Sequence, residues 1–531
     1  MVTGFMRLAA SGVLSLCAAS ATAETVTILH TNDFHSRIEP INAFDSTCSV
    51  QANAEGTCFG GSARLLTAIR AARAAAPNSL LVDGGDQFQG TLFYTYYKGV
   101  AAAEMMNALG YDAMTVGNHE FDDGPEVLRG FMDAVDFPVL MANADVSEEP
   151  ALAGALKPSV ILERGGEKIG LIGLTPRDTP DIASPGPRIQ FIDPVPAVQA
   201  EVARLTDAGV RRIIALSHSG YVTDLRVAAS VDGIDVIVGG HSNTYLSNTS
   251  AMADGPYPTW VTTPSGGRTA VVQAYAYGKY LGKLDVTFDR AGIVARATGE
   301  PILIDNEIAE DSSLKDRIAV LAKPLEEVRT KVVGEAATPI GTARETCRSQ
   351  ECAIGNLIAD AMLDRVYDQG IDIAIQNGGG IRASIDAGPI TMGEVLTVLP
   401  FQNLISTFRL SGADVVASLE AAVSQVEDGR GRFPQVAGLR YTYTMNEAPN
   451  DGRILNVEVM QDGFWVPIDP GESYGVVSND FMRRGGDGYE LFAENAMDAY
   501  DFGPDLADVV ADYLSKKTPY TPYLDGRIKV D

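Results

Sequence analysis

The placement of the histidines is the feature that most constrains how this chain can fold. The sequence contains only five, and four of them lie in short polar clusters that follow apolar, strand-like runs. Histidines scattered through a hydrophobic core would show no such pattern. Because the carboxyl ends of neighbouring parallel strands meet at one edge of a sheet, the clusters predict one site built from several strand ends. The clustered candidates are Asp33, His35, Asp86, Asn118, His119, His218, His241 and Asn243.

The apolar runs alternate with helical patterns, which predicts a layered α/β domain. A hairpin is expected over 160–174, around Gly165 and Gly166, and a loop over 36–61. Strands are expected at 26–29, 79–82, 113–116, 139–143, 213–216 and 236–238, and helices at 63–75, 100–109 and 195–207.

The chain has 531 residues, which is too long for one core, and its composition, 46% hydrophobic and 21% charged, is that of a globular protein. We therefore predict two domains. The boundaries follow changes of pattern: a signal segment over 1–23, an N-terminal domain over 24–305, a helical linker over 306–331 that Pro324 interrupts, and a C-terminal domain over 332–531.

The formal charge of −28 argues against a broad basic face for polymeric nucleic acid or an anionic membrane. An anionic substrate must then be held by local positive charge, from metal ions or a few arginines.

Residues 1–23 have the pattern of a secretory signal: Arg7, an apolar stretch, and a small-residue cleavage site ending at Ala23. A lipoprotein site at Cys17 is the alternative, although Leu16 is bulky for it. No later stretch is apolar enough to anchor the chain in a membrane, so we expect a soluble, secreted or periplasmic protein.

Four cysteines remain after the signal, and they fall into two local pairs. In an oxidising compartment they predict disulfides between Cys48 and Cys58 and between Cys347 and Cys352. The alternatives are free thiols or a zinc site, but neither pair has the usual knuckle spacing.

The first-domain clusters combine oxygen and imidazole donors without thiolate, which favours two divalent ions of the zinc or manganese type. Asp86 can bridge such a pair, and paired ions can activate water and polarise a phosphoryl oxygen. Asn243 has a second interpretation, as a turn cap. His30 precedes its cluster and is assigned a structural role. His119 is the candidate catalytic residue, and Asp122, three residues on, can orient its imidazole.

The second domain carries candidates for binding a nucleotide. A glycine-rich turn, 377–382, lets backbone approach a ligand closely. Arg348 and Arg382 suit phosphate, Phe401 and Phe481 can stack on a base, and Asp487 can accept from ribose hydroxyls. Either phenylalanine alone also fits a core position.

Taken together, these motifs resemble the 5′-nucleotidase family over nearly the whole chain after residue 23. The resemblance implies a four-layer α/β/β/α metallophosphatase domain, a linker helix and a C-terminal α/β domain. It implies one metal ion on Asp33, His35, Asp86 and Asn243, a second on Asp86, Asn118, His218 and His241, a catalytic dyad of His119 and Asp122, and a nucleotide pocket of Arg348, Asn377, Arg382, Phe401, Phe481 and Asp487. Bacterial members can carry Gln where this chain has Asn243.

The function expected is hydrolysis of nucleoside 5′-monophosphates, small-molecule substrates, to nucleoside and phosphate. UDP-sugars, 2′,3′-cyclic nucleotides or sulfur compounds are alternative substrates for the same chemistry. A nucleotide-binding protein without turnover is the alternative class, and the retained His119 and Asp122 argue against it. The sequence leaves base preference and oligomeric state open.

Overall fold

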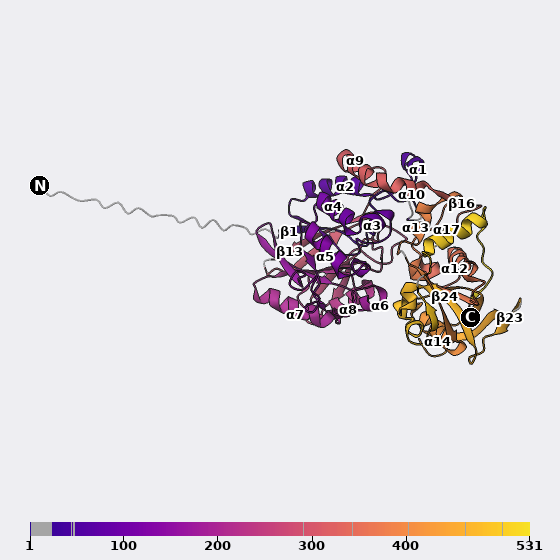
Figure 1. Ribbon diagram of the computed structural model, residues 1–531. Coiled ribbons are helices and arrows are strands. Elements are labelled where there is room, and N and C mark those ends of the chain that lie inside the picture. Colours follow the sequence, from indigo (N-terminus) through magenta and orange to yellow (C-terminus); the bar gives the residue numbers. More distant parts are fainter. Residues whose placement is uncertain are drawn as a thin grey trace.

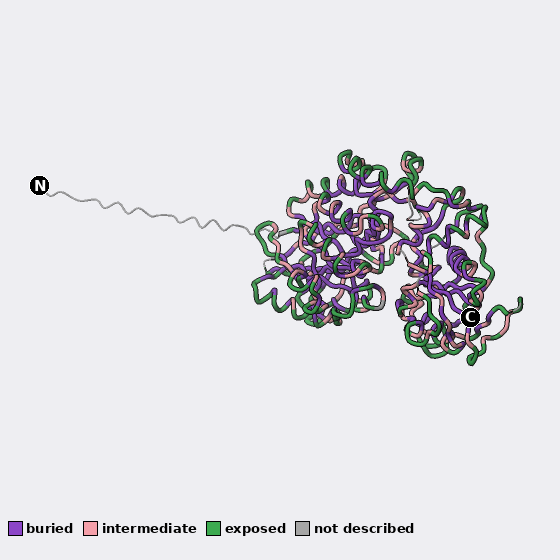
Figure 2. The backbone as a smooth tube through the Cα atoms, in the orientation of Figure 1, coloured by how far each residue is buried: buried purple, intermediate pink, exposed green. Residues whose placement is uncertain are grey.

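The computed structural model consists of two lobes side by side (Figure 1). It describes residues 1, 24–43, 45, 48–289, 291–341, 344–401, 403–461, 463–501 and 503–531. The expected signal segment, with Cys17, lies outside the described residues apart from Met1. Buried backbone runs through the interior of each lobe separately, so each has a core of its own (Figure 2). Among the described residues, no helix is long and apolar enough to cross a bilayer.

Two sheets stack face to face in the N-terminal lobe. One has the order β14-β13-β1-β2-β3-β4, with β15 also paired to β13, and the other the order β11-β12-β10-β9-β7-β6. The first contains β1 Glu24–Thr31, β2 Ser79–Asp83, β3 Ala113–Thr115, β4 Val139–Leu140, β13 Tyr280–Phe288, β14 Val294–Gly299 and β15 Ile302–Leu303. The second contains β6 Ser159–Arg164, β7 Glu167–Leu174, β9 Arg212–Ser217, β10 Val236–Val238, β11 Thr259–Thr262 and β12 Arg268–Val272.

Side-chain alternation explains the layering. On β1, Ile28 packs into the core between the two sheets, whereas Leu29 packs into the core beneath the helices. Strands buried on both faces read as continuous apolar runs, which is why they were recognisable in the sequence. The first sheet is covered by α2 Ser62–Ala75, α4 Gly99–Leu109 and α5 Pro125–Ala134, and the second by α7 Pro194–Asp207 and α8 Tyr221–Ser230. The four layers agree with the predicted fold class.

A broken helix leads from one lobe to the other along the top of the molecule (Figure 1). It consists of α9 Ser312–Ala322, the 3-10 turn η2 Lys323–Leu325 and α10 Glu326–Thr330. Asp311 caps α9 by accepting a hydrogen bond from the Leu314 amide at 2.9 Å. Pro324 lies inside the 3-10 turn, which fits the predicted interruption. The exact domain boundaries stay a prediction.

The C-terminal lobe is built on a five-stranded sheet of order β20-β17-β24-β19-β25. Helices α12 and α17 pack on one face, and α14 and a smaller sheet of order β23-β22-β21-β26 pack on the other. The strands are β17 Ile373–Asn377, β19 Ile405–Ser411, β20 Pro434–Ala437, β21 Leu439–Tyr443, β22 Ile454–Gln461, β23 Phe464–Pro467, β24 Ser473–Asn479, β25 Met497–Tyr500 and β26 Ile528–Val530. The helices include α12 Ala353–Val366, α13 Met392–Val398, α14 Gly412–Ala422, α15 Asp480–Arg483, α16 Glu490–Glu494 and α17 Leu506–Lys516.

The lobes meet at a surface that we call the interlobe seam. Arg329 of α10 forms an ion pair with Glu39 of the N-terminal lobe at 2.9 Å, and Asn42 donates a hydrogen bond to Asp386 of the C-terminal lobe at 3.4 Å. A short helix, α6 Thr179–Ile182, lies against the 3-10 turn η5 Gly486–Gly488 at the same seam.

Two local expectations need correction, and three helices were not predicted. The loop expected over 36–61 contains α1 Val50–Ala54, which begins where Ser49 accepts from the Ala52 amide at 3.0 Å. The strand expected over 139–143 ends at Leu140. The pattern also gave no indication of α3 Leu92–Tyr97, α5 or α8. Both predicted cysteine pairs are present as disulfides, Cys48–Cys58 and Cys347–Cys352.

Candidate active site

The polar clusters lie together at the carboxyl ends of the strands in both sheets of the N-terminal lobe. Asp33 and His35 follow β1, and Asp86 follows β2; Asn118 follows β3, His218 follows β9, and His241 and Asn243 follow β10. Five of these residues have left-handed backbone, with φ of 50° at Asp33, 50° at His35, 59° at Asp86, 69° at His241 and 54° at Asn243. Such backbone is strained for residues other than glycine and concentrates at functional sites.

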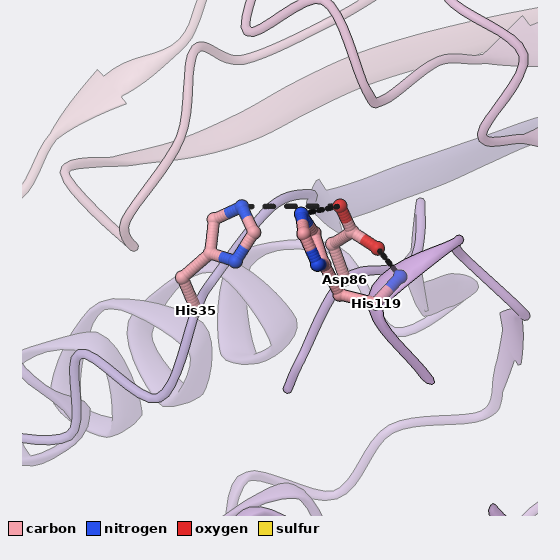
Figure 3. Close-up of side chains that lie close together, drawn as sticks. All are labelled: His35, Asp86 and His119. Carbon is pink, nitrogen blue, oxygen red and sulfur yellow. Dashed lines mark hydrogen bonds and ion pairs between the residues drawn. The ribbon is translucent and has the colours of Figure 1, made fainter. Parts of the chain in front are cut away.

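Asp86 is the centre of the cluster (Figure 3). Its Oδ2 lies 2.9 Å from Nε2 of His218, 3.8 Å from Nε2 of His35 and 3.9 Å from Nε2 of His119. Oδ1 of Asp33 lies 3.9 Å from Nε2 of both His35 and His218. Two groups with metal-site spacing share Asp86: one with His35 and His119, the other with His218 and His241.

The protonation pattern of the histidines fits cation binding. Nδ1 of His35 donates to the Phe88 carbonyl at 3.0 Å, and Nδ1 of His218 donates to the Gly84 carbonyl at 2.6 Å. Both Nε2 atoms therefore face carboxylate oxygens. Burial lowers the pKa of His218, but Asp86 and Asp33 outweigh it and raise that pKa to about 10, so the surroundings of Nε2 demand positive charge. A divalent ion supplies that charge, and the oxygen and nitrogen donors suit it.

The remaining members of the cluster are held by short polar contacts. Nδ1 of His241 lies 3.0 Å from Oδ1 of Asn118, and the His241 amide donates to Oδ2 of Asp33 at 2.8 Å. The His119 amide donates to Oδ1 of Asp86 at 2.9 Å. Asn243 is buried in the loop that carries His241. Whether each of these residues binds metal stays a prediction.

Glu120 is a residue of the site that the sequence reasoning missed. Its buried carboxylate accepts from four backbone amides, those of Gly117 at 2.6 Å, Gln87 at 2.8 Å, Asp86 at 3.0 Å and Phe88 at 3.2 Å. Burial and the charge of Asp86 raise the pKa of Glu120 to about 7. The side chain ties the loop after β2 to the loop after β3. Its position next to His119, in the run 115–122, was the feature of the sequence that could have indicated a role in the site.

His119 and Asp122 form a hydrogen-bonded pair. Nδ1 of His119 lies 2.6 Å from Oδ2 of Asp122, which leaves Nε2 directed toward Asp86. Burial lowers the pKa of His119, but Asp122 and Asp86 outweigh this effect and raise it. The imidazole is therefore able to carry a proton beside the cluster. On the other side of its ring lies Phe401 of the C-terminal lobe, with centroids 5.5 Å apart.

The predicted nucleotide-binding residues divide into two groups. Some reach the cluster in the N-terminal lobe, and for the others we describe contacts within the C-terminal lobe. Arg382 and Phe401 reach the cluster: an Arg382 guanidinium nitrogen lies 3.2 Å from Nε2 of His35, and the guanidinium carbon lies 5.7 Å from the centroid of the Phe401 ring. Asn377 donates to Asp487 at 2.6 Å on the C-terminal lobe. Arg348, next to the Cys347–Cys352 bridge, donates to the Gly429 carbonyl at 3.0 Å.

The ring of Phe481 packs against the turn that carries Asp487, since a Cβ built on Gly486 would lie 2.5 Å from that ring. Both Phe401 and Phe481 are partly exposed, so each has surface for stacking. Burial raises the pKa of Asp487, while the hydrogen bond from Asn377 and the nearby Arg348 act in the opposite direction.

Comparison with known proteins identifies the relationship. Residues 26–245 match the calcineurin-like phosphoesterase family, and residues 332–494 match the 5′-nucleotidase C-terminal domain. The chain is 39% identical to the 5′-nucleotidase of Diplobatis ommata over 98% of this chain and 92% of the relative. It is 39% identical to the human 5′-nucleotidase over 96% and 92%, respectively.

The chain belongs to the 5′-nucleotidase family. A solved 5′-nucleotidase precursor from Thermus thermophilus is 41% identical, covers 96% of this chain and 99% of its own, and superposes with a TM-score of 0.91. As a member of the 5′-nucleotidase family, the protein is a metal-dependent phosphoric monoester hydrolase. Its candidate ligands are the carboxylates and imidazoles around Asp86.

Proposed function

We propose that this enzyme hydrolyses nucleoside 5′-monophosphates to nucleoside and phosphate with two divalent metal ions, of zinc or manganese type. One observation carries the proposal: two side chains of the C-terminal lobe that we expect to bind nucleotide contact the metal-type cluster of the N-terminal lobe. Arg382 contacts His35 and Phe401 stacks on His119. A phosphate at the cluster would thus lie beside an aromatic ring that suits a base.

The cluster divides into two metal sites that share one carboxylate. Divalent ions bound there would supply Lewis acidity, neutralising phosphoryl oxygens and lowering the pKa of a water molecule. We assign Asp33, His35, Asp86 and Asn243 to one ion, and Asp86, Asn118, His218 and His241 to the other. The hydrogen bonds among these residues and the left-handed backbone of the loops that carry them hold the donor atoms in place before substrate binds.

His119 serves as the proton-carrying residue. Its Nδ1 contact with Asp122 orients the ring and favours the imidazolium. Nε2–H can then donate to the phosphoryl group as negative charge develops on it and on the leaving oxygen.

The C-terminal lobe orients the nucleotide. Arg348 and Arg382 bind phosphate oxygens, because a guanidinium matches them with two parallel donors. Phe401 and Phe481 stack on the base, and Asp487, held by Asn377, accepts from the ribose hydroxyls. Substrate entry and product release require the interlobe seam to open, with the broken helix α9–α10 as the hinge.

We also propose that the enzyme is exported. The signal-like pattern of residues 1–23 supports this, and so do the two disulfides, which persist in oxidising compartments. Peptide mapping of the secreted or periplasmic fraction tests it: mature protein should begin near Glu24, and protein retained in the reducing cytoplasm with residues 1–23 intact would contradict export.

A substrate panel tests the activity. Release of inorganic phosphate is measured from adenosine, guanosine and uridine 5′-monophosphates. Chromatography detects uridine 5′-monophosphate and sugar 1-phosphate from a UDP-sugar, and the nucleoside monophosphate from a 2′,3′-cyclic nucleotide. Each reaction is run with and without chelator. We expect chelator-sensitive release from the monophosphates. Preferential turnover of the UDP-sugar or the cyclic nucleotide would assign the alternative substrate, and metal-replete protein that binds nucleotide without turnover would support the binding class.

A further inference from the structure

An additional arginine reaches the cluster from the C-terminal lobe. Arg430 lies in the loop between the 3-10 turn η4 Val423–Gln425 and β20. One guanidinium nitrogen lies 3.0 Å from Nε2 of His241, and another lies 3.3 Å from Oδ2 of Asp178, at the start of α6. Both contacts cross the interlobe seam.

Arg430 and Arg382 contact different histidines of the cluster. Arg382 contacts His35, which belongs to one of the two metal-type groups around Asp86, and Arg430 contacts His241, which belongs to the other. A phosphate bound by ions at these two groups would therefore have a guanidinium beside each group. The chain is strongly acidic overall, with a formal charge of −28, so local cations of this kind are needed to attract an anion.

The backbone that carries Arg430 is fixed, whereas its present contacts are weak. The carbonyl of Gly429 accepts from Arg348 at 3.0 Å, and the carbonyl of Gly431 accepts from the Gly379 amide at 2.8 Å. The Arg430 and Asp178 side chains are 35% and 37% exposed, and ion pairs so exposed contribute little to stability. A phosphate oxygen offers a stronger, charge-assisted acceptor, so exchanging the present contacts for it is favourable.

We propose that Arg430 binds the substrate phosphate together with Arg382, and so favours phosphomonoesters with a dianionic terminal group. The proposal rests on the proposed function for the identity of the substrate. It does not depend on turnover, because inorganic phosphate carries the same group. The competing interpretation is that Arg430 only latches the lobes together through Asp178.

Two matched substitutions separate these interpretations. Arg430→Gln removes the guanidinium and both contacts, whereas Asp178→Asn removes only the latch. Arg296→Gln removes one positive charge from an exposed strand position elsewhere and controls for net charge. Arg430→Lys keeps the charge but loses the planar fork, and should recover part of the binding. Thermal melts of all variants verify folding.

Calorimetric titration of metal-reconstituted protein with inorganic phosphate, and separately with adenosine, gives the decisive readout. For Arg430→Gln we expect phosphate affinity to fall about 10-fold or more, as for a lost charge-assisted hydrogen bond, with adenosine affinity unchanged. Asp178→Asn and Arg296→Gln should bind phosphate like the parent. Parental phosphate affinity in Arg430→Gln, or an equal loss in Asp178→Asn, overturns the proposal. A parent enzyme that hydrolyses no nucleotide would refute the proposed function and leave this comparison intact.

Discussion

The imidazole of His119 and the phenyl ring of Phe401 lie stacked across the interlobe seam, with centroids 5.5 Å apart and ring planes at 25°. One ring belongs to the candidate hydrolytic centre and the other to the candidate base pocket. The contact therefore places the chemistry of one lobe directly beside the recognition surface of the other.

Replacing His119 should separate chemistry from metal binding. Because His119 carries a proton oriented by Asp122, we expect His119→Ala to lower kcat by about 10²- to 10⁴-fold. Metal content, measured by elemental analysis, should stay near that of the parent. A matching fall in bound metal would reassign His119 as a ligand.

Removing the stacking ring should weaken nucleotide binding. Phe401→Ala is expected to cost about 1–3 kcal/mol of binding free energy, as for loss of a base-stacking partner, seen mainly as a higher KM for adenosine 5′-monophosphate. Phe464, which is 73% exposed on β23, gives the control substitution Phe464→Ala. An unchanged KM in Phe401→Ala would remove this ring from the pocket.

Glu120 should matter for stability as much as for activity. An amide in its place points a donor at backbone amides that now share a carboxylate, so Glu120→Gln should cost about 1–3 kcal/mol of unfolding free energy. The substitution should also weaken metal binding, because the loop that carries Asp86 would lose hydrogen bonds to residue 120. Thermal melts and metal titration measure both effects, with exposed Glu126→Gln as the neighbouring control.

The second disulfide should tune phosphate recognition. Arg348 follows Cys347 directly, so reducing Cys347–Cys352 or replacing both cysteines by serine frees the segment that aims the guanidinium. We expect KM to rise more than kcat falls. Replacing Cys48 and Cys58 instead should leave KM less affected, since none of the predicted phosphate-binding arginines adjoins that bridge. Equal effects from both pairs would point to general destabilisation.

Chelation should abolish turnover and lower the melting temperature. A ligand bound only by the folded state stabilises it, by about 2.7 kcal/mol at a hundredfold excess over Kd. Removing the metal also removes the positive charge that offsets the negative charges of the Asp33 and Asp86 carboxylates, which lie close to the same histidines. Calorimetric melts before and after chelation, followed by zinc or manganese readdition, measure the effect. Full activity in metal-free protein would contradict it.

The residues of the N-terminal site were predictable because each polar cluster follows an apolar run, and parallel strands bring their ends together. His30 also behaved as expected: it is buried and 2.8 Å from the Tyr257 hydroxyl, outside the metal-type groups. The strand order and the face-to-face sheets required the family resemblance, since periodicity alone does not specify which strands pair.

The contacts of two other residues, Glu120 and Arg430, were not predictable from the local sequence. Glu120 binds backbone amides, and sequence carries little information about where amides point when the loop turns through left-handed conformations. Arg430 contacts His241, 189 residues earlier in the chain, from a glycine-rich loop with no distinctive spacing. Contacts across the interlobe seam depend on how the two folded lobes pack against each other. The sequence pattern of either lobe does not predict this packing.

The candidate hydrolytic groups and the candidate base-recognition groups belong to separately packed units, so we expect that the two properties can evolve apart. If Phe401 and Phe481 form the proposed base pocket, substitutions next to them should alter which nucleoside is accepted while the Asp86 cluster stays intact. The same division bears on inhibitor design. A compound with an aromatic group at one end and a metal-binding group at the other would contact both lobes and stabilise their present, closed arrangement.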